Sequence, residues 1–421
     1  MPSDFDRVTS KHPCRICNKP DYCSISRNAR VSICMRVSAG AKGRARKDNG
    51  WIHINHGVPV THNSPPPTPK FPPVKLAPIE VRDAIYRELI RISPANRYHQ
   101  LIDHPEVGLL SRGLLLEETV SYGALPATQR ERGRLARSLR SFAKARFPQY
   151  ANLIGIPGIW RDEKGFSQIW ARYDYRMPML LIPNKDRERR IQACQLRLHP
   201  EDLTTEHPNK YLWLSSPNKL AGCSSGTPIH FTFDPESVPA GAEVVVIEGT
   251  LKADTLVSLR PGIYSIATSG VNCAHAEIIV ATRQYNVLMG FDADYRTNPA
   301  VCTQLASLIA ERQLDLEQKQ LSFTTRILSW QGYKGIDEAA LHNAPIEAIS
   351  IQQWFNGLSN DSSTQVQEIW RGMKYAISES SAGEDDYELY QPQTSANQYH
   401  PRDDFDGDHN PSLPNAVVAG E

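Results

Sequence analysis

The feature that most constrains the fold is a pair of short apolar runs, each followed closely by acidic side chains. VVVIEGTLKAD (residues 244–254) carries Glu248 at the end of its apolar run, and NVLMGFDADYR (286–296) carries Asp292 and Asp294. Such runs, rich in β-branched residues, are typical of buried parallel strands, and a helix-like segment follows each. Parallel sheets collect functional side chains at the carboxyl ends of their strands. We therefore expect the three carboxylates to lie close together.

A third run has the same form. TTRILSW (324–330) resembles a strand, and Asp337 and Glu338 follow it. One aspartate pair after an apolar run is often only a polar strand end, but three such ends in chain order favour a shared role. Carboxylate oxygens are the ligands that hold Mg²⁺ or Mn²⁺ against phosphate groups. The expected ligands of this catalytic ion are Glu248, Asp292, Asp294 and Asp337.

Four of the eight cysteines fall within residues 14–34, and the first two have the C-x2-C spacing of zinc ribbons. YCSIS and RVSIC then form two short alternating patterns. If residues 27–30 make the turn between them, Cys23 lies opposite Cys34, close enough for both to reach one ion. So short a segment needs a metal to fold. The expected ligands of this structural Zn²⁺ are Cys14, Cys17, Cys23 and Cys34, with His53 and then His12 as alternatives for the fourth position.

Charge is distributed unevenly along a chain whose net charge is only +1. Residues 1–60 carry eleven Lys or Arg against four acidic residues, while residues 376–421 carry one Arg against ten. A basic front suits an anionic polymer, and an acidic end poor in apolar residues is typical of a disordered tail. No apolar stretch reaches the roughly 18 residues of a membrane span, and no secretion signal is evident. Clustered cysteines without such a signal indicate a cytoplasmic protein.

These motifs, in this order, resemble the toprim family, and within it the bacterial DNA primases and their plasmid- and phage-borne relatives. IEGTLKAD (247–254) is similar to the family's strand-end glutamate and glycine, FDADYRTN (291–298) to its aspartate pair, and YKGIDEA (333–339) to its later turn. NKYLWLSSP (209–217) is similar to a primase loop, and the cysteine unit to the primase zinc-binding domain. An uncharacterised group of toprim-like proteins from mobile elements is closer, because it shares the leucine-lysine-alanine-aspartate sequence after the glutamate.

The chain departs from the primase pattern in three ways. A typical primase carries an aspartate soon after the glutamate, but here Thr250, Leu251 and Lys252 precede Asp254. Lys252 is therefore expected to contact phosphate or to pair with Glu248. Primase zinc units usually end in a second C-x2-C, which this chain lacks, so the fourth zinc ligand stays open. No P-loop motif occurs, so a helicase would be a separate protein.

The resemblance implies a primase-like nucleotidyltransferase that makes short primers on single-stranded DNA from nucleoside triphosphates, in the replication of a plasmid, phage or other mobile element. Its zinc unit would contact template, and a separate replicative helicase is a candidate partner. Two alternatives stay open: a toprim metal-dependent nuclease, and a non-catalytic factor that binds single-stranded nucleic acid. Side chains expected to face nucleic acid or nucleotide, unless they are surface salt-bridge partners, are Arg172, Arg176, Lys185, Arg197, Lys210 and Lys252.

The expected fold is α/β: a toprim-type, doubly wound and mostly parallel core, preceded by an α+β primase-like subdomain and a small N-terminal zinc ribbon. The subdomain contains two helical patterns, IEVRDAIYRELIRI and TQRERGRLARSLRSFAKARF, and then a strand pair joined by KDRERR. The expected boundaries are 1–58 for the ribbon, 59–78 for a proline-rich linker, 79–235 for the subdomain, 236–350 for the core, 351–376 for a helical segment and 377–421 for an acidic disordered tail.

Overall fold

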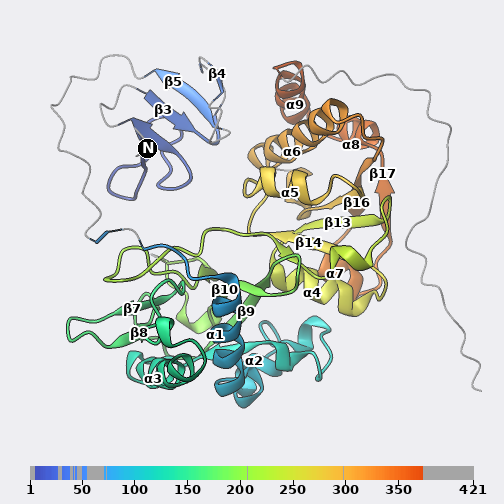
Figure 1. Cartoon of the computed structure of the whole chain (residues 1–421). Helices are drawn as coiled ribbons and strands as arrows, with labels where there is room; N and C mark the ends of the chain where they lie inside the picture. Colours follow the sequence, from blue (N-terminus) through green and yellow to red (C-terminus); the bar gives the residue numbers. More distant parts are fainter. Residues whose placement is uncertain are drawn as a thin grey trace, which may run out of the picture.

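The computed structural model describes residues 5–26, 31–37, 41, 43–44, 50–54, 71–72, 74–205, 207–296 and 298–372. The turn expected at residues 27–30, most of the proline-rich linker and the whole acidic tail lie outside the described residues. None of the described helices is long and apolar enough to cross a membrane. Three regions follow one another along the chain, each built around a sheet (Figure 1).

The first region is a small antiparallel sheet in the order β1-β2-β3-β5-β4, here called the cysteine module. Its strands are β1 Phe5–Arg7, β2 Ser24–Ser26, β3 Val31–Cys34, β4 Gly43–Arg44 and β5 Trp51–Ile54. Ser24 pairs with Ile33, so the next position along each strand places Cys23 opposite Cys34, as predicted. Its cluster of buried apolar residues contains only Val8 and three of the cysteines. So small a core needs a further source of stability.

The second region is an antiparallel sheet in the order β11-β10-β9-β6, with helices packed on it. Its strands are β6 Gly123–Leu125, β9 Met179–Lys185, β10 Ile191–Arg197 and β11 Tyr211–Trp213, and a separate hairpin is formed by β7 Ile159–Arg161 and β8 Ser167–Ile169. Its helices are α1 Ile79–Ile92, α2 His99–Ile102 and α3 Gln129–Arg146, with the short 3-10 helices η1 Ala95–Arg97, η2 Leu110–Arg112, η3 Thr119–Ser121, η4 Pro148–Tyr150 and η5 Pro200–Asp202. A further 3-10 helix, η6 Pro235–Ser237, belongs to the third region, where the Tyr285 hydroxyl donates to the backbone oxygen of Pro235.

The two predicted helices and the predicted strand pair of this region are confirmed. Helix α1 forms because its apolar residues recur every three or four positions, which gathers Val81, Ile85 and Leu89 into one buried stripe. The turn between β9 and β10 is closed by Asp186, whose carboxylate accepts a hydrogen bond from the backbone N–H of Arg190 at 2.8 Å.

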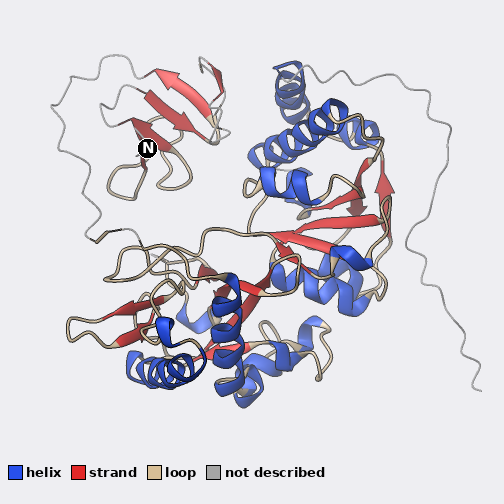
Figure 2. Ribbon diagram, in the orientation of Figure 1, coloured by secondary structure: helices blue, strands red, loops and turns tan. Residues whose placement is uncertain are grey.

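The third region is a six-stranded sheet in the order β12-β14-β13-β15-β16-β17, with helices on both faces (Figure 2). Its four central strands run parallel, and the two edge strands are antiparallel to their neighbours. The strands are β12 His230–Phe231, β13 Glu243–Glu248, β14 Tyr264–Thr268, β15 Asn286–Gly290, β16 Thr325–Trp330 and β17 Ile346–Ile349. The helices are α4 Thr250–Leu259, α5 His275–Ala281, η7 Ala293–Arg296, α6 Pro299–Gln318, α7 Ile336–Leu341, α8 Ile351–Asn356 and α9 Asn360–Gly372.

Strand β13 is apolar along most of its length because both of its faces are covered. Val244 and Val246 belong to the apolar cluster formed with α5, α6, α8 and α9, whereas Val245 and Ile247 belong to the cluster formed with α4 and α7. A continuous apolar run is what burial on two faces demands. The mixed α/β class and the parallel pairing of β13 with β15 are confirmed. Strand β14, which the sequence analysis did not identify, lies on the other side of β13.

Candidate metal sites at the strand ends and in the cysteine module

Glu248 and Asp292 lie at the carboxyl ends of two hydrogen-bonded parallel strands. The paired positions of β13 and β15 continue to the end of β15, so Glu248, the last residue of β13, lies beside the segment that carries Asp292. Gly249 has a positive φ of 97°, which lets the chain turn directly from β13 into α4. Asp294 lies in η7, and Asp337 comes from the first turn of α7. These four carboxylates are called the acid group below.

Positively charged side chains of the same chain already contact the acid group. Lys252, in the first turn of α4, donates a short hydrogen bond from Nζ to Oδ1 of Asp292. Lys334 Nζ lies 3.5 Å from the other carboxylate oxygen of Asp292. Arg112 Nη1 lies 3.3 Å from Oδ2 of Asp337. The expected ion pair of Lys252 with Glu248 is thus replaced by one with Asp292, because the lysine reaches across to the end of the neighbouring strand.

Burial leaves the acid group with negative charge that is poorly compensated. Desolvation, and then the charge of Asp292, raise the pKa of Glu248 to about 7. The same two causes raise the pKa of Asp294, and desolvation raises the pKa of Asp337. Raised carboxylate pKa values mean that additional positive charge would be favourable here. The chemistry of the oxygen donors therefore suits a hard divalent cation such as Mg²⁺.

The acid group is not a compact ligand set. In the described part of the chain, the cysteines of the module form the one group of three or more acidic, histidine or cysteine side chains whose ligand atoms all lie within 4.8 Å of one another. The four carboxylates do not meet that condition. Mg²⁺ usually keeps several waters and takes only one or two protein carboxylates, so a compact set is not required for binding.

Two separate cavities adjoin the acid group. One, of about 270 Å³, is lined by Glu248 and Asp294 and also by Tyr22 and Arg36 of the cysteine module. The other, of about 350 Å³, is lined by Asp337 together with the Arg112 that pairs with it. Asp292 lines neither cavity and is only 6% exposed. Glu248 and Asp294 therefore face one opening, and Asp337 faces another.

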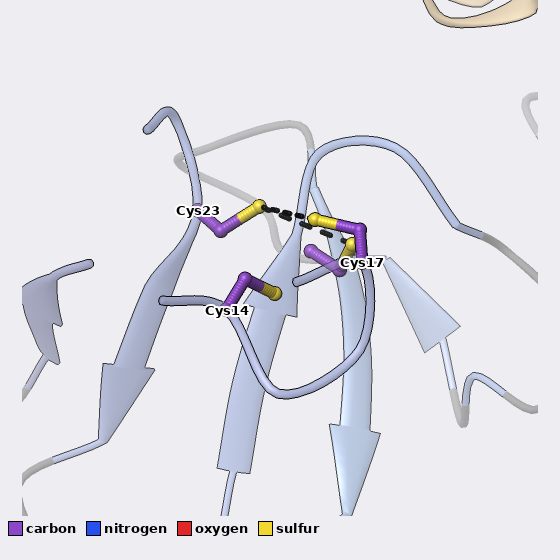
Figure 3. A group of neighbouring side chains, drawn as sticks. Cys14, Cys17 and Cys23 are labelled. Atoms are coloured by element: carbon purple, nitrogen blue, oxygen red, sulfur yellow. Dashed lines mark hydrogen bonds between the residues drawn. The ribbon is translucent and has the colours of Figure 1, made fainter. Parts of the chain in front are cut away.

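Four sulfur atoms converge in the cysteine module (Figure 3). The Sγ atoms of Cys14, Cys17, Cys23 and Cys34 all lie within 4.8 Å of one another. The Sγ atom of Cys23 lies 3.7 Å from that of Cys17 and 3.9 Å from that of Cys34. The hydrogen bond from Cys23 lowers the pKa of the Cys34 thiol to about 5. Four thiol ligands at this spacing fit a tetrahedral Zn²⁺.

The two histidine alternatives do not join the sulfur atoms. His53 lies on the additional strand β5, where it pairs with Ser32. Its Nε2, however, lies 2.7 Å from the backbone oxygen of Val37. His12 is exposed and is absent from the sulfur group. The backbone N–H of Met35 donates to Cys23 Sγ at 3.3 Å, a contact that favours a negatively charged sulfur. Neither histidine is therefore placed to take the fourth position, whereas all four cysteines are close enough to share one ion.

The side chains expected to face nucleic acid divide into exposed and buried ones. Arg172, Arg176 and Lys210 are exposed. Arg197 is only 6% exposed, and its two terminal nitrogens donate to backbone carbonyls of the segment before η2, each at 3.1 Å. An arginine fixed in this way does not fit the expectation that Arg197 faces template. Lys185 is half-buried and lines a third cavity, of about 440 Å³.

A buried polar network next to α4 was missed by the sequence analysis. The Tyr122 hydroxyl donates to Asp254 Oδ2 at 2.7 Å, and His230 Nε2 lies 3.1 Å from Oδ1. The backbone N–H of Lys185 donates to His230 Nδ1 at 3.0 Å, which leaves the imidazole proton on Nε2 to bond Asp254. Burial by itself would raise the pKa of Asp254, but His230 and its other partners lower it to about 2. The network joins the second region to the third.

Comparison with known proteins finds structural likenesses only. No protein-family model matches the sequence, and no curated protein matches it. The zinc-binding and RNA polymerase domains of the Aquifex aeolicus primase are similar at 14% identity, over 72% of this chain and 70% of that chain, with a TM-score of 0.43. A DNA primase domain from Pseudomonas aeruginosa is similar at 15% identity, over 69% of this chain and 97% of that chain, with a TM-score of 0.43.

A third similar structure is the DnaG primase catalytic domain bound to single-stranded DNA, at 14% identity, over 70% of this chain and 94% of that chain, with a TM-score of 0.39. These similarities concern the backbone fold.

Proposed function

We propose that this chain is a DNA primase-like nucleotidyltransferase with a toprim-type core, which makes short primers on single-stranded DNA from nucleoside triphosphates during replication of a plasmid, phage or other mobile element. One observation carries the proposal: Glu248 and Asp294, at the carboxyl ends of neighbouring parallel strands, line the same cavity as Tyr22 and Arg36 of the cysteine module. Acidic oxygens for a cation and groups suited to a nucleic-acid strand thus face one space.

In the proposed enzyme, the acid group is the reaction centre. Glu248, Asp292 and Asp294 would hold Mg²⁺ or Mn²⁺, which supplies positive charge to the phosphates during nucleotidyl transfer. The Lys334 side chain is 67% exposed beside Asp292 and can approach a phosphate from solvent. Asp337, the fourth expected ligand, lines the other cavity with Arg112.

The cysteine module would present the single strand. Tyr22 is 55% exposed, which makes its ring available for stacking on a base. The Arg36 guanidinium lies 5.3 Å from the centre of that ring, so it adds positive charge next to the stacking face. Zn²⁺ on the four cysteines would have a structural role, since it fixes the loop that carries both side chains. A separate replicative helicase remains a candidate partner.

A primer-synthesis assay tests the proposal. The full-length, zinc-loaded protein is incubated with varied single-stranded DNA templates, ribo- or deoxynucleoside triphosphates, and Mg²⁺ or Mn²⁺. Wild type is expected to yield short products, and Asp292→Ala is expected to yield none while it keeps its zinc and its fold. Absence of product from wild type with every template and nucleotide would reject primase activity.

One observation favours a second function, metal-dependent cleavage of nucleic acid. Glu248 lines a cavity beside Asp294, and no ion pair holds its carboxylate among the described residues, so it is placed to take a proton from a water in that cavity. Incubation of DNA with the protein and Mg²⁺, without nucleotides, separates the two functions. Loss of intact DNA that Glu248→Gln abolishes would support the nuclease.

A further inference from the structure

We propose that Lys252 is a built-in cation of the acid group, which fills one cation position permanently and leaves room for a single divalent ion beside Glu248 and Asp294. This inference deepens the proposed function and rests on it. It concerns how many ions the protein binds and which side chain decides that number.

The contacts of Lys252 place its ammonium group inside the acid group. Its Nζ is hydrogen-bonded to Oδ1 of Asp292, and the lysine side chain is only 22% exposed. The neighbouring backbone position is Gly335, where a Cβ atom would lie 3.3 Å from Lys252 Nζ and directly against Asp337 Oδ1. The ammonium group and both carboxylates therefore border the same small space. A glycine at this position leaves that space open.

The balance of charge argues against two divalent ions. Four carboxylates form the acid group, and Lys252, Lys334 and Arg112 contact two of them. With every group ionised, one unit of negative charge remains. Before a nucleotide binds, one divalent ion would bring the acid group to one unit of positive charge and two ions would bring it to three, so a partly buried site favours one ion. Lys334 is the weakest of the three cations because solvent screens its 67% exposed side chain.

The position that remains for an ion is the cavity beside Glu248 and Asp294. The cavity of about 270 Å³ is lined by Glu248, Asp294 and Gln304. Gln304 is 5% exposed, and its buried Oε1 has no hydrogen-bond partner among the described residues. Its amide oxygen is thus a further neutral acceptor for a cation or for a water bound to it. Lys252 does not line this cavity, so an ion there and the lysine ammonium group would occupy separate positions.

Counting bound Mn²⁺ tests the inference. Mn²⁺ is titrated into the full-length, zinc-loaded protein, and free Mn²⁺ is measured by electron paramagnetic resonance. Wild type is expected to bind one tight ion, which Asp294→Asn loses. Lys252→Gln is expected to bind a second ion, or the first about tenfold more tightly, because the positive charge that pairs with Asp292 has been removed. Lys319→Gln, an exposed lysine at the end of α6, is the matched control and should behave as wild type.

Each outcome decides the inference. Two tight ions in wild type, or none, would overturn it, and this count does not depend on whether any variant folds. Unchanged number and affinity in folded Lys252→Gln would also overturn it. Primer synthesis is measured on the same samples. Wild type that binds one ion but makes no primer defeats the proposed function alone, and wild type that makes primers with two ions defeats the inference alone.

Discussion

The cysteine module and the acid group differ in what surrounds their ligand atoms. In the module, four sulfur atoms lie within 4.8 Å of one another, with a backbone N–H donating to one of them. In the acid group, Glu248 and Asp294 line one cavity and Asp337 lines another. Lys252, Lys334 and Arg112 contact two of the four carboxylates. The first is a closed arrangement suited to a structural metal. The second keeps open positions, as a reaction centre requires.

The two regions also differ in what holds them folded. The buried cluster of the module consists of Val8 and three cysteines, so metal binding and folding must be nearly one event. The third region is held by apolar clusters on both faces of its sheet, and its acids contribute little to that packing. The apolar packing can therefore offset unfavourable burial of charge at the acid group.

The largest effect is expected from Glu248→Gln, which removes charge from the acid group and keeps its shape. Primer synthesis should fall about a thousandfold, which corresponds to roughly 4 kcal/mol of lost electrostatic stabilisation. Without divalent ions the free energy of unfolding should rise, since burial and Asp292 penalise the charged form of Glu248. Activity and denaturant unfolding are measured together. A fall in both, with exposed Glu317→Gln unchanged, would show that the acid group supports the fold after all.

The next effect is expected from Cys34→Ser in the module. Loss of contacts around a metal ligand typically costs 10- to 100-fold in affinity, so loss of the ligand itself should weaken Zn²⁺ binding by more than about a hundredfold. Competition with a chelator measures this. Cys302→Ser, in the buried core of the third region, should lower the unfolding midpoint without changing zinc affinity. Equal zinc affinity in wild type and Cys34→Ser would show that Cys34 is not a zinc ligand.

Asp254 shows how a buried carboxylate behaves when the protein itself supplies its partners. Its pKa in the folded protein, about 2, lies below its ordinary value of 3.8, so its contribution to stability is complete above that value and fades as pH falls toward 2. Asp254→Asn should therefore cost about 2 kcal/mol of unfolding free energy at pH 7 and less at pH 3. Denaturant unfolding at both pH values measures the difference. If Asp254→Asn lowered the free energy of unfolding equally at both pH values, the pKa of Asp254 would not be lowered in the folded protein.

The smallest effect is expected from Tyr22→Ala, which tests whether the cysteine module contacts the DNA strand on which the acid group would act. Loss of one stacked base should weaken binding of single-stranded DNA about tenfold, or roughly 1.4 kcal/mol. Fluorescence anisotropy with a labelled oligonucleotide measures the affinity. Phe166→Ala removes a similarly exposed ring, 52% against 55%, from the β7–β8 hairpin and is the control. An equal loss of DNA affinity in Tyr22→Ala and Phe166→Ala would mean that Tyr22 does not stack on a base in the way proposed.

Local sequence patterns were enough to predict the mixed α/β class, the strands that end at or just before Glu248 and Asp292, and the meeting of the four cysteines. These features follow from local patterns. A continuous apolar run specifies burial on two faces, and a short hairpin specifies which cysteine lies opposite which. The motif resemblance supplied the expected chemistry of the acids.

Which cations meet which acids depends on tertiary contacts and could not be predicted from the sequence. Arg112 reaches Asp337 across 225 positions, and Tyr122 reaches Asp254 across 132. It likewise buried Arg197, which the sequence presents as one more basic residue of a strand. The physical reason is that periodicity and turn chemistry act between residues a few positions apart. The partner of a buried charge is fixed by how separate regions close on one another, and no local pattern records that.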